Sequence, residues 1–412
     1  MKKYILIILC CLTSFPLWSY NVNMIVEHYS VDQGLPNNTV NCTLKDRDGF
    51  IWFGTWYGLC CFDGVKFKTF NKQEHDSDVP PRKIQRIVED KNGYIWVKTI
   101  DRKLYVFNKV TECFHAVYDD MKNYSENIQV IKLQNTAEGD VLLLTKDKNL
   151  LLAGVDEKGQ VTIKILFDSR NEINKHDYTL KHHVLCETEE YISWIGTDYK
   201  VAAVHKGSEL ASRPADFITS KINSGDKDSF TSFFEDGRKV WVGDRAGIFY
   251  SIDVRTGLVN RYVLSEIKGA ISNLLVTPAG YVYLSVAGQG TYEYDLAERR
   301  LQKINTEMND AMVTHAFIDQ YDKIWFHENE KALIYYDPLN HTAKRFPFTM
   351  FGKITTLYSE DAGERGLFFL SPAGEAWLFD REHAEMVYIN KLKQLSNDRA
   401  NQQIYHLMLD ND

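Results

Sequence analysis

A short pattern of glycine, an aromatic residue, isoleucine and tryptophan recurs along this chain of 412 residues. It is clearest in Gly49-Phe50-Ile51-Trp52 and Gly93-Tyr94-Ile95-Trp96, each followed by a threonine three residues after the tryptophan. Weaker copies bring the total to seven, spaced 42 to 52 residues apart, with anchors at Trp52, Trp96, Leu142, Trp194, Trp241, Tyr283 and Trp325. Repeats of this length indicate an array of units that pack on their neighbours, which constrains the fold more than any other feature.

Each unit predicts four strands. The residues before the tryptophan segment alternate between apolar and polar, as in Val40–Leu44, and an Asp-Gly or Asn-Gly hairpin turn follows. A third strand is expected at Leu59–Phe62 and a fourth at Lys66–Phe70. Four short strands with a period of two are typical of a propeller blade. We therefore expect an all-β fold, a seven-bladed β-propeller of four-stranded antiparallel blades over residues 24–350.

An eighth unit is expected beyond residue 350, with strands at Ile354–Ser359, Gly366–Leu370 and Glu375–Asp380. Ile404–Asp412 resembles the first strand and turn of a ninth. We expect residues 351–412 to begin a second, incomplete propeller, too short to close a ring, so that this end is either partly unsupported or taken up by the first ring. Near the N-terminus, Ile25–Ser30 resembles a fourth strand and is a candidate for closing the last blade, in competition with Lys344–Phe348.

The N-terminus has the pattern of a secretory signal. Lys2 and Lys3 precede the apolar run Tyr4–Leu12, and Ser19 is the candidate residue before cleavage. We assign residues 1–19 to a signal peptide, with an uncleaved membrane anchor as the alternative. No other stretch approaches the roughly 20 apolar residues of a membrane span. The remainder is expected to be exported to the periplasm.

Charge and cysteine content exclude several functions. The net charge of −8 gives no basic surface for nucleic acid. The cysteines outside the signal are odd in number and irregularly spaced, which favours buried apolar side chains over disulfides, at Cys42, Cys60, Cys61, Cys113 and Cys186. The pair His182-His183 lacks an evident third ligand. No metal and no cofactor are expected.

No catalytic motif is present. The sequence has no HExxH, no GxSxG, no P-loop and no GxGxxG. Asp46-Arg47-Asp48-Gly49 resembles a calcium loop but has Tyr57 where the closing glutamate belongs, so we interpret it as a hairpin. We expect no catalytic residues. A glycosidase with carboxylates in the central funnel is the alternative, with Asp101 and Asp244 the first positions to test.

Tryptophan divides into two groups. The five that recur at the repeat register are expected to pack between blades, at Trp52, Trp96, Trp194, Trp241 and Trp325. Trp56 and Tyr57 lie outside the register, in the loop after the second strand. With residues of the equivalent loops they form the candidate ligand-binding set of Trp56, Tyr57, Arg102, Lys103, Tyr199 and Arg245.

Such a mixture suits carbohydrate, which is bound by aromatic stacking and many hydrogen bonds. The near-balanced charge of these loops predicts no preference for anionic glycans. A solvated surface without a ligand is the alternative.

The segments Tyr29–Val40 and Asp48–Gly64 together resemble the two-component regulator propeller repeat. That repeat forms the periplasmic sensor region of Bacteroides-type hybrid two-component histidine kinases. The resemblance extends over about residues 29–412 and implies a longer protein. Its further parts would be a second propeller, an immunoglobulin-like domain, a membrane helix, a histidine kinase, a receiver and a helix-turn-helix.

The resemblance implies a periplasmic, glycan-sensing propeller that binds an oligosaccharide without catalysis and controls polysaccharide utilisation. The expected partner is an oligosaccharide, not nucleic acid. Membrane contact is expected only through the signal or a missing C-terminal helix, and a homodimer is left open. The alternatives are a secreted polysaccharide lyase or glycosidase, and a protein-interaction scaffold.

Overall fold

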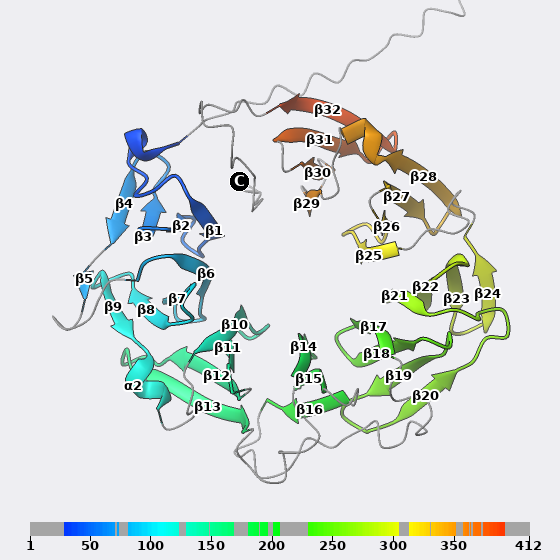
Figure 1. Ribbon diagram of the computed structural model, residues 1–412, viewed down its shortest axis with the longest axis horizontal. Helices are drawn as coiled ribbons and strands as arrows, with labels where there is room; N and C mark the ends of the chain where they lie inside the picture. The colour runs from blue at the N-terminus through cyan, green and yellow to red at the C-terminus, as the bar shows by residue number, and fades with distance from the viewer. Residues whose placement is uncertain are drawn as a thin grey trace, which may run out of the picture.

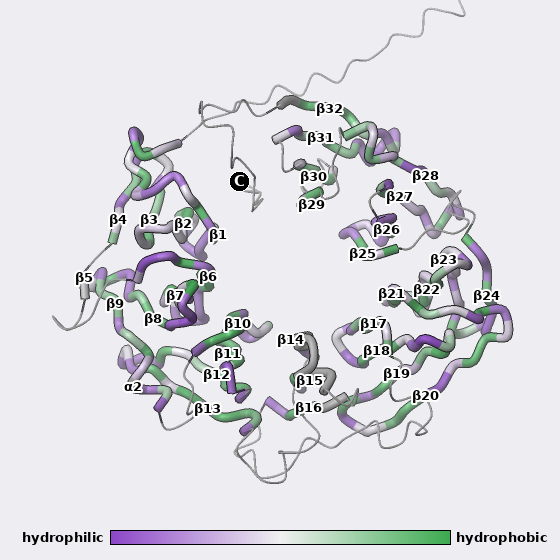
Figure 2. The backbone as a smooth tube through the Cα atoms, viewed as in Figure 1, coloured by the Kyte–Doolittle hydropathy of each residue, from purple (hydrophilic) through white to green (hydrophobic). Residues whose placement is uncertain are grey.

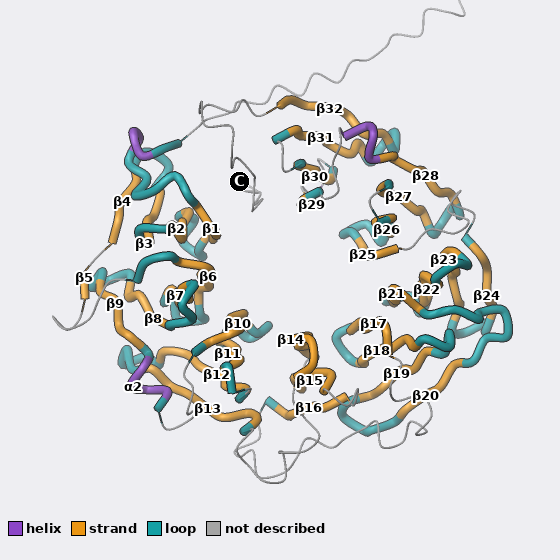
Figure 3. The backbone as a smooth tube through the Cα atoms, in the orientation of Figure 1, coloured by secondary structure: helices purple, strands orange, loops and turns teal. Residues whose placement is uncertain are grey.

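The computed structural model describes residues 29–70, 72–73, 81–122, 129–147, 149–168, 180–188, 190–196, 201–206, 230–304, 313–329, 331–351, 357–361, 363, 366–371 and 374–391. Within these ranges the chain forms eight β-sheets. Helix is limited to three short pieces of that part of the chain, η1 (Val31–Gln33), α2 (Tyr118–Met121) and η4 (Phe348–Phe351) (Figure 3).

Strands follow chain order within almost every sheet, and sequential strands pair antiparallel. Sheet 1 contains β1 (Val40–Lys45), β2 (Ile51–Thr55), β3 (Gly58–Phe62) and β4 (Phe67–Phe70). Sheet 2 contains β6 (Ile84–Glu89), β7 (Ile95–Thr99), β8 (Leu104–Asn108) and β9 (Cys113–Ala116), with β5 (Lys72–Gln73) added parallel to β9. Sheet 3 contains β10 (Val130–Asn135), β11 (Val141–Thr145), β12 (Leu150–Val155) and β13 (Val161–Phe167). Sheet 4 has three described strands, β14 (Leu180–Glu187), β15 (Tyr191–Gly196) and β16 (Val201–His205).

The second half repeats the same order. Sheet 5 contains β17 (Phe230–Glu235), β18 (Lys239–Asp244), β19 (Phe249–Asp253) and β20 (Val259–Tyr262). Sheet 6 contains β21 (Ile271–Val276), β22 (Tyr281–Val286), β23 (Gly290–Asp295) and β24 (Arg300–Lys303). Sheet 7 contains β25 (Val313–Ile318), β26 (Ile324–Glu328), β27 (Ala332–Asp337) and β28 (Thr342–Pro347). Sheet 8 contains β29 (Tyr358–Asp361), β30 (Leu367–Leu370), β31 (Glu375–Asp380) and β32 (Glu385–Lys391).

The sheets stand around a common centre as the blades of a propeller (Figure 1). The first strand of each sheet lies nearest the centre and the last strand lies outermost (Figure 1). The predicted all-β propeller of four-stranded antiparallel blades is confirmed. Sheet 8 lies beside sheet 7 in the same ring (Figure 1), as in the alternative that the first ring takes up the incomplete end. The division at residue 350 stays a prediction, and both Ile404–Asp412 and most of the proposed clasp lie outside the described residues.

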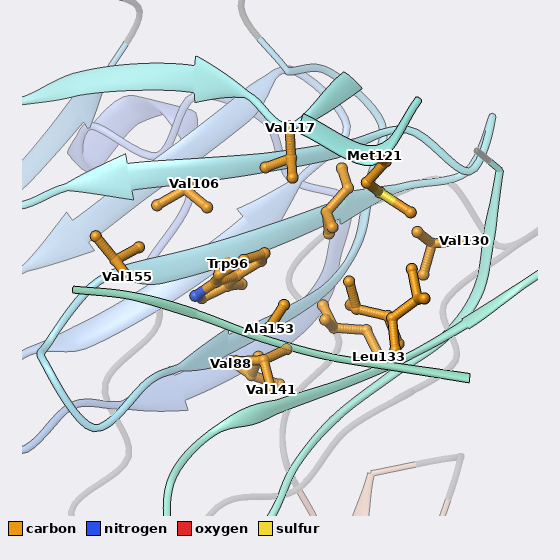
Figure 4. Packing of buried hydrophobic residues seen from close by; sticks show 13 residues of the cluster. Val88, Trp96, Val106, Val117, Met121, Val130, Leu133, Val141, Ala153 and Val155 are labelled. Carbon is orange, nitrogen blue, oxygen red and sulfur yellow. The ribbon is translucent and has the colours of Figure 1, made fainter. Parts of the chain in front are cut away.

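Hydrophobic clusters join consecutive sheets. Each of the seven junctions, from sheet 1 to sheet 8, has a buried cluster with members from both neighbours. Between sheets 2 and 3, Trp96 packs among residues of β8, α2, β10, β11 and β12 (Figure 4). Hydrophobic and hydrophilic residues alternate along many strands (Figure 2), because successive side chains point to opposite faces. Burial between blades is therefore the main contribution to stability.

The repeated tryptophans lie in these junctions, as predicted. Trp52, Trp96, Trp241 and Trp325 are at most 3% exposed and belong to four different clusters. The side chain of Trp194 lies outside the described residues. The cysteines Cys42, Cys60, Cys61 and Cys113 are buried and free, which confirms their interpretation as apolar side chains. Burial raises the pKa of the Cys60 thiol to about 12.

Among the residues that the structure describes, three junctions also carry an ion cluster of the same design, which we call a junction clamp. A cation follows the third strand of one sheet, between a carboxylate that ends the first strand of that sheet and a carboxylate in the first turn of the preceding sheet. Nitrogen–oxygen distances run from 2.5 to 3.0 Å. The three clamps are Lys109 with Glu89 and Asp46, Lys206 with Glu187 and Glu138, and Arg381 with Asp361 and Asp319.

Candidate functional site

Loops at one end of the ring are joined across sheets 1 and 2 by main-chain hydrogen bonds. The amide of Lys83, just before β6, donates to the carbonyl of Trp56 at 2.9 Å. The amide of Ile100 donates to the carbonyl of Lys83 at 2.9 Å. The loop after β2 is thus tied to the loop after β7, which holds Arg102. We call this surface, formed by Trp56, Tyr57, Lys83, Ile100 and Arg102, the Trp56 rim.

Aromatic side chains are exposed on the Trp56 rim. The exposed fraction is 38% for Trp56 and 60% for Tyr57. The Nζ of Lys83 lies 5.3 Å from the centre of a Trp56 ring, within the range of a cation–π contact. Below, Thr55 Oγ1 donates to the Gly58 carbonyl at 2.8 Å and fixes the turn. The Trp56 rim therefore exposes a fixed aromatic side chain beside the ammonium group of Lys83.

The neighbouring loop places the two predicted basic residues of sheet 2. Arg102 has a left-handed φ of 68° and an exposed side chain. Lys103 Nζ lies 3.3 Å from Asp101 Oδ2. Burial raises the pKa of Asp101, but hydrogen bonds from Thr99 and Lys103 outweigh this and hold it below its usual value. These residues line a cavity of about 370 Å³ with Leu104, Tyr105, Ala116, Val117, Tyr118, Met121 and Gln129.

Beneath the rim, the inner strands repeat a β-bulge. The register with the second strand shifts in seven sheets; in sheet 4 the shift lies between Leu180 and Leu185. In the other six it is a single bulge residue, namely Asn41, Gln85, Ile131, Thr231, Ser272 or Thr314. In sheet 2 the bulge brings Gln85 to Lys98, whose Nζ donates to Gln85 Oε1 at 2.7 Å. Arg86, the next residue, is the cross-strand partner of Lys98. The bulge therefore aims polar groups from β6 and β7 at the same end of the ring as the rim.

The structure does not bring the six predicted residues into one site. Trp56, Tyr57, Arg102 and Lys103 lie in adjacent loops of sheets 1 and 2. Arg245 is exposed after β18 in sheet 5, so it belongs to a separate part of the ring (Figure 1). Tyr199 lies outside the described residues, as do the side chains of His182 and His183. No prediction for these last three is tested.

Asp244, a test position for the enzymatic alternative, supports a turn. It is fully buried, and its Oδ1 accepts the amides of Ala246 and Ile248 at 2.8 Å. Thr99 and Thr145 occupy the same register in sheets 2 and 3 and bond to their own loops in a similar way. The residue three positions after each anchor is thus a turn-forming residue in these sheets.

One carboxylate cluster has the spacing of a metal site. Oxygens of Asp46, Asp48 and Glu89 lie within 4.8 Å of one another. The Nζ of Lys109 lies within 3.0 Å of all three side chains and takes the position of the cation. Asp46 also accepts the Trp52 indole at 2.7 Å, so the Asp46–Gly49 segment is a hairpin, as the sequence predicted.

Sequence reasoning missed Lys83, Arg86 and Lys98. Arg86 and Lys98 lie on strands, whereas the predicted ligand-binding residues were all placed in loops. Alignment of the repeats could have singled out Lys98, because this lysine occupies the position of Gly54 in the first repeat. Arg86 and Lys83 do not differ from the repeat pattern in any way that would single them out, so only the structure identifies them.

Residues 34–57 match the family model described as Two component regulator propeller. The chain carries a two-component regulator propeller repeat. The resemblance stated from the sequence is confirmed over this stretch, which runs from η1 to the Trp56 rim. A search of curated proteins finds no match.

Solved structures of similar fold include the extracellular domains of two hybrid two-component systems. The extracellular domain of the hybrid two-component system BT4673 from B. thetaiotaomicron is 13% identical, with TM-score 0.36 over 88% of this chain and 62% of its own. That of BT3049 from the same organism is 15% identical, with TM-score 0.37 over 89% and 55%. Virginiamycin B lyase from Staphylococcus aureus is 13% identical, with TM-score 0.36 over 73% and 94%. The chain spans 55% to 62% of the length of these two extracellular domains.

Proposed function

We propose that this propeller is the ligand-sensing region of a hybrid two-component system, that it binds an oligosaccharide at the Trp56 rim, and that it performs no catalysis. The observation that carries the proposal is the regulator propeller repeat at residues 34–57, which ends in the exposed Trp56–Tyr57 loop. A kinase would lie in a further part of the protein. Signalling requires a ligand that binds one arrangement of the sensor better than another.

The chemistry of the rim supports a sugar ligand. Exposed aromatic rings stack on the apolar faces of sugars, while Lys83 and Arg102 offer hydrogen-bond donors to hydroxyl groups. The main-chain bonds between Trp56, Lys83 and Ile100 hold these groups in place. A preorganised surface loses less conformational freedom when it binds.

We also propose that the propeller acts in the periplasm. Support comes from the N-terminal pattern of Lys2, Lys3 and the apolar run Tyr4–Leu12. Across the described residues, no helix is both long and hydrophobic enough to span a bilayer.

Calorimetric titration of the full chain with a panel of plant and host oligosaccharides tests the function. We expect one glycan class to bind, and Trp56→Ala to weaken it roughly fivefold, as loss of about 1 kcal/mol of aromatic contact implies. Phe50→Ala is the matched control, since Phe50 is 41% exposed but precedes β2 at the opposite end of the sheet. It should leave binding unchanged.

Three results would overturn the proposal. Binding of no glycan contradicts an oligosaccharide sensor. Equal binding by wild type and Trp56→Ala removes the site from the rim. Turnover of a glycan, followed by chromatography of the products, would instead establish the lyase or glycosidase alternative.

A further inference from the structure

Sheet 2 has a lysine where the equivalent position is closely packed in other sheets. Lys98 corresponds in register to Gly54 of sheet 1 and Gly243 of sheet 5. A Cβ atom at Gly54 would lie 2.4 Å from Cys42 Sγ, and one at Gly243 would lie 2.4 Å from Ser232 Oγ. Packing in those sheets thus requires glycine. Lys98 is nevertheless only 7% exposed, so a long cation has been accommodated inside sheet 2.

The surroundings of Lys98 are cationic. Its cross-strand partner is Arg86, and within the described part of the chain its ammonium group donates to the neutral amide of Gln85. Burial lowers the pKa of Lys98, and the charges of Arg102 and Arg86 lower it further. Among the described residues, no carboxylate forms an ion pair with Lys98, Arg86 or Arg102. We call these three residues the cation cluster.

Two other largely buried cations in the described part of the chain are paired with carboxylates. Lys109 and Lys206 are 18% and 12% exposed, and each contacts at least two carboxylates. The cation cluster therefore stands out in a protein of net charge −8. Like charges placed directly opposite each other on a sheet are destabilising. A local arrangement that opposes stability in this way is characteristic of functional sites.

The position of the cluster connects it with the proposed ligand surface. Arg102 belongs to the Trp56 rim, and Arg86 is exposed on the inner strand two residues after β6 begins. The guanidinium group is planar and binds carboxylate or sulfate through paired hydrogen bonds. An anion between Arg86 and Arg102 would also neutralise the field at Lys98.

We propose that Lys98, Arg86 and Arg102 bind the carboxylate or sulfate group of an acidic oligosaccharide whose neighbouring rings lie against Trp56 and Tyr57. This inference rests on the proposed function and specifies its ligand class. It replaces the sequence-based expectation of no preference for anionic glycans, which counted charges in loops only and so omitted the strand residues Lys98 and Arg86.

The test compares acidic and neutral forms of the same sugars. The full chain is titrated with uronic-acid oligosaccharides, with sulfated oligosaccharides and with their carboxyl-reduced or desulfated counterparts. We expect at least ~10-fold tighter binding of one acidic form, as a charge-assisted bidentate pair implies, with affinity falling as salt rises. Lys98→Met and Arg86→Met should each remove most of this preference. Lys303→Met, which removes an exposed charge from β24, is the matched control.

Thermal unfolding without ligand separates binding from a structural role. Because Lys98 lies between two arginines without an anion, Lys98→Met should raise the melting temperature while lowering acidic-sugar affinity. A lysine that only supports the fold would lower the melting temperature on substitution.

The outcomes distinguish the two proposals. If no oligosaccharide of either charge binds, the proposed function itself fails. If neutral and acidic forms bind equally, the function stands and the cation cluster is not a ligand site. A preference for acidic sugars that persists in both Lys98→Met and Arg86→Met also overturns the inference.

Discussion

The indole nitrogen of Trp96 donates to Oδ2 of Asp90 across 2.9 Å, and both residues are buried. Oδ1 of the same carboxylate accepts the amides of Asn92 and Tyr94 at 3.0 Å. One aspartate therefore closes the first turn of the blade and orients the tryptophan toward the next blade. The same bond recurs at Trp52 with Asp46, Trp241 with Asp236 and Trp325 with Asp319.

Asp90→Ala should destabilise the propeller by about 2–4 kcal/mol, because it leaves a buried indole N–H and two turn amides without their acceptor. Asp156→Ala is the control, since Asp156 accepts two amides at 2.9 Å in an outer turn and, among the described residues, no indole. Urea unfolding followed by tryptophan fluorescence measures both. Equal losses would show that the indole bond contributes nothing.

Lys109→Met should cost about 3–5 kcal/mol at neutral pH, because it leaves three carboxylates facing one another. Burial raises the pKa of Asp46, but hydrogen bonds from Trp52 and Lys109 outweigh it and hold that pKa below its ordinary value. The stabilisation by ionised Asp46 is therefore fully present above about pH 4, the unfolded value, and is lost as the pH falls through the lower folded value.

The difference in unfolding free energy between wild type and Lys109→Met should accordingly shrink below about pH 4, as Asp46 takes up a proton. Denaturant titrations at pH 7 and pH 3 give the two differences, with Lys303→Met as the charge-matched control. A constant difference at both pH values would contradict the role assigned to the clamp.

Gly54→Ala should destabilise the fold by roughly 1–3 kcal/mol, because the new Cβ would lie 2.4 Å from Cys42 Sγ and 2.6 Å from Ile84 Cγ2. Gly154→Ala, in β12, meets only ordinary contacts of 3.4 Å or more and should be nearly neutral. Thermal denaturation of the two variants provides the comparison. If they behave alike, the close packing at the glycine register is not limiting.

Arg381→Met should loosen sheet 8 without unfolding sheets 1 to 6. Arg381 bridges Asp319 of sheet 7 and Asp361 of sheet 8, and it stacks 4.4 Å from the Tyr321 ring. Hydrogen exchange measured by mass spectrometry should show faster exchange in peptides of residues 358–391. Unchanged exchange there would show that the hydrophobic cluster around Trp325 and Phe379 suffices to hold sheet 8.

The blades could be predicted from the sequence because their determinants are local. A turn residue, a tryptophan and alternating apolar positions recur at fixed spacing, and each specifies its own hairpin. The sequence left open whether sheet 8 joins the first ring, because every blade of a repeat protein carries the same pattern. Which ring a blade joins depends on contacts such as Arg381 with Asp319, which are 62 residues apart.

The candidate site could be predicted only in part, because the sequence pattern of each repeat is local. Trp56 and Tyr57 were recognisable because they break the repeat register in a loop. Arg245 shares their loop position but lies in another blade, so equivalence in the repeat did not mean proximity. Lys83 approaches Trp56 only through the main-chain bonds between sheets 1 and 2, a relationship between blades that no single repeat encodes.

The junction clamps divide the blade junctions into two kinds. Junctions with Lys109, Lys206 or Arg381 add ion pairs, which dissolved salt screens, to their hydrophobic clusters. Val254 and Leu296 occupy the position of the clamp cation in sheets 5 and 6. Their junctions rely on apolar contact, which salting-out ions strengthen. Screening by salt therefore weakens the ionic contribution at the three clamped junctions, so the relative stability of the blade junctions changes with ionic strength.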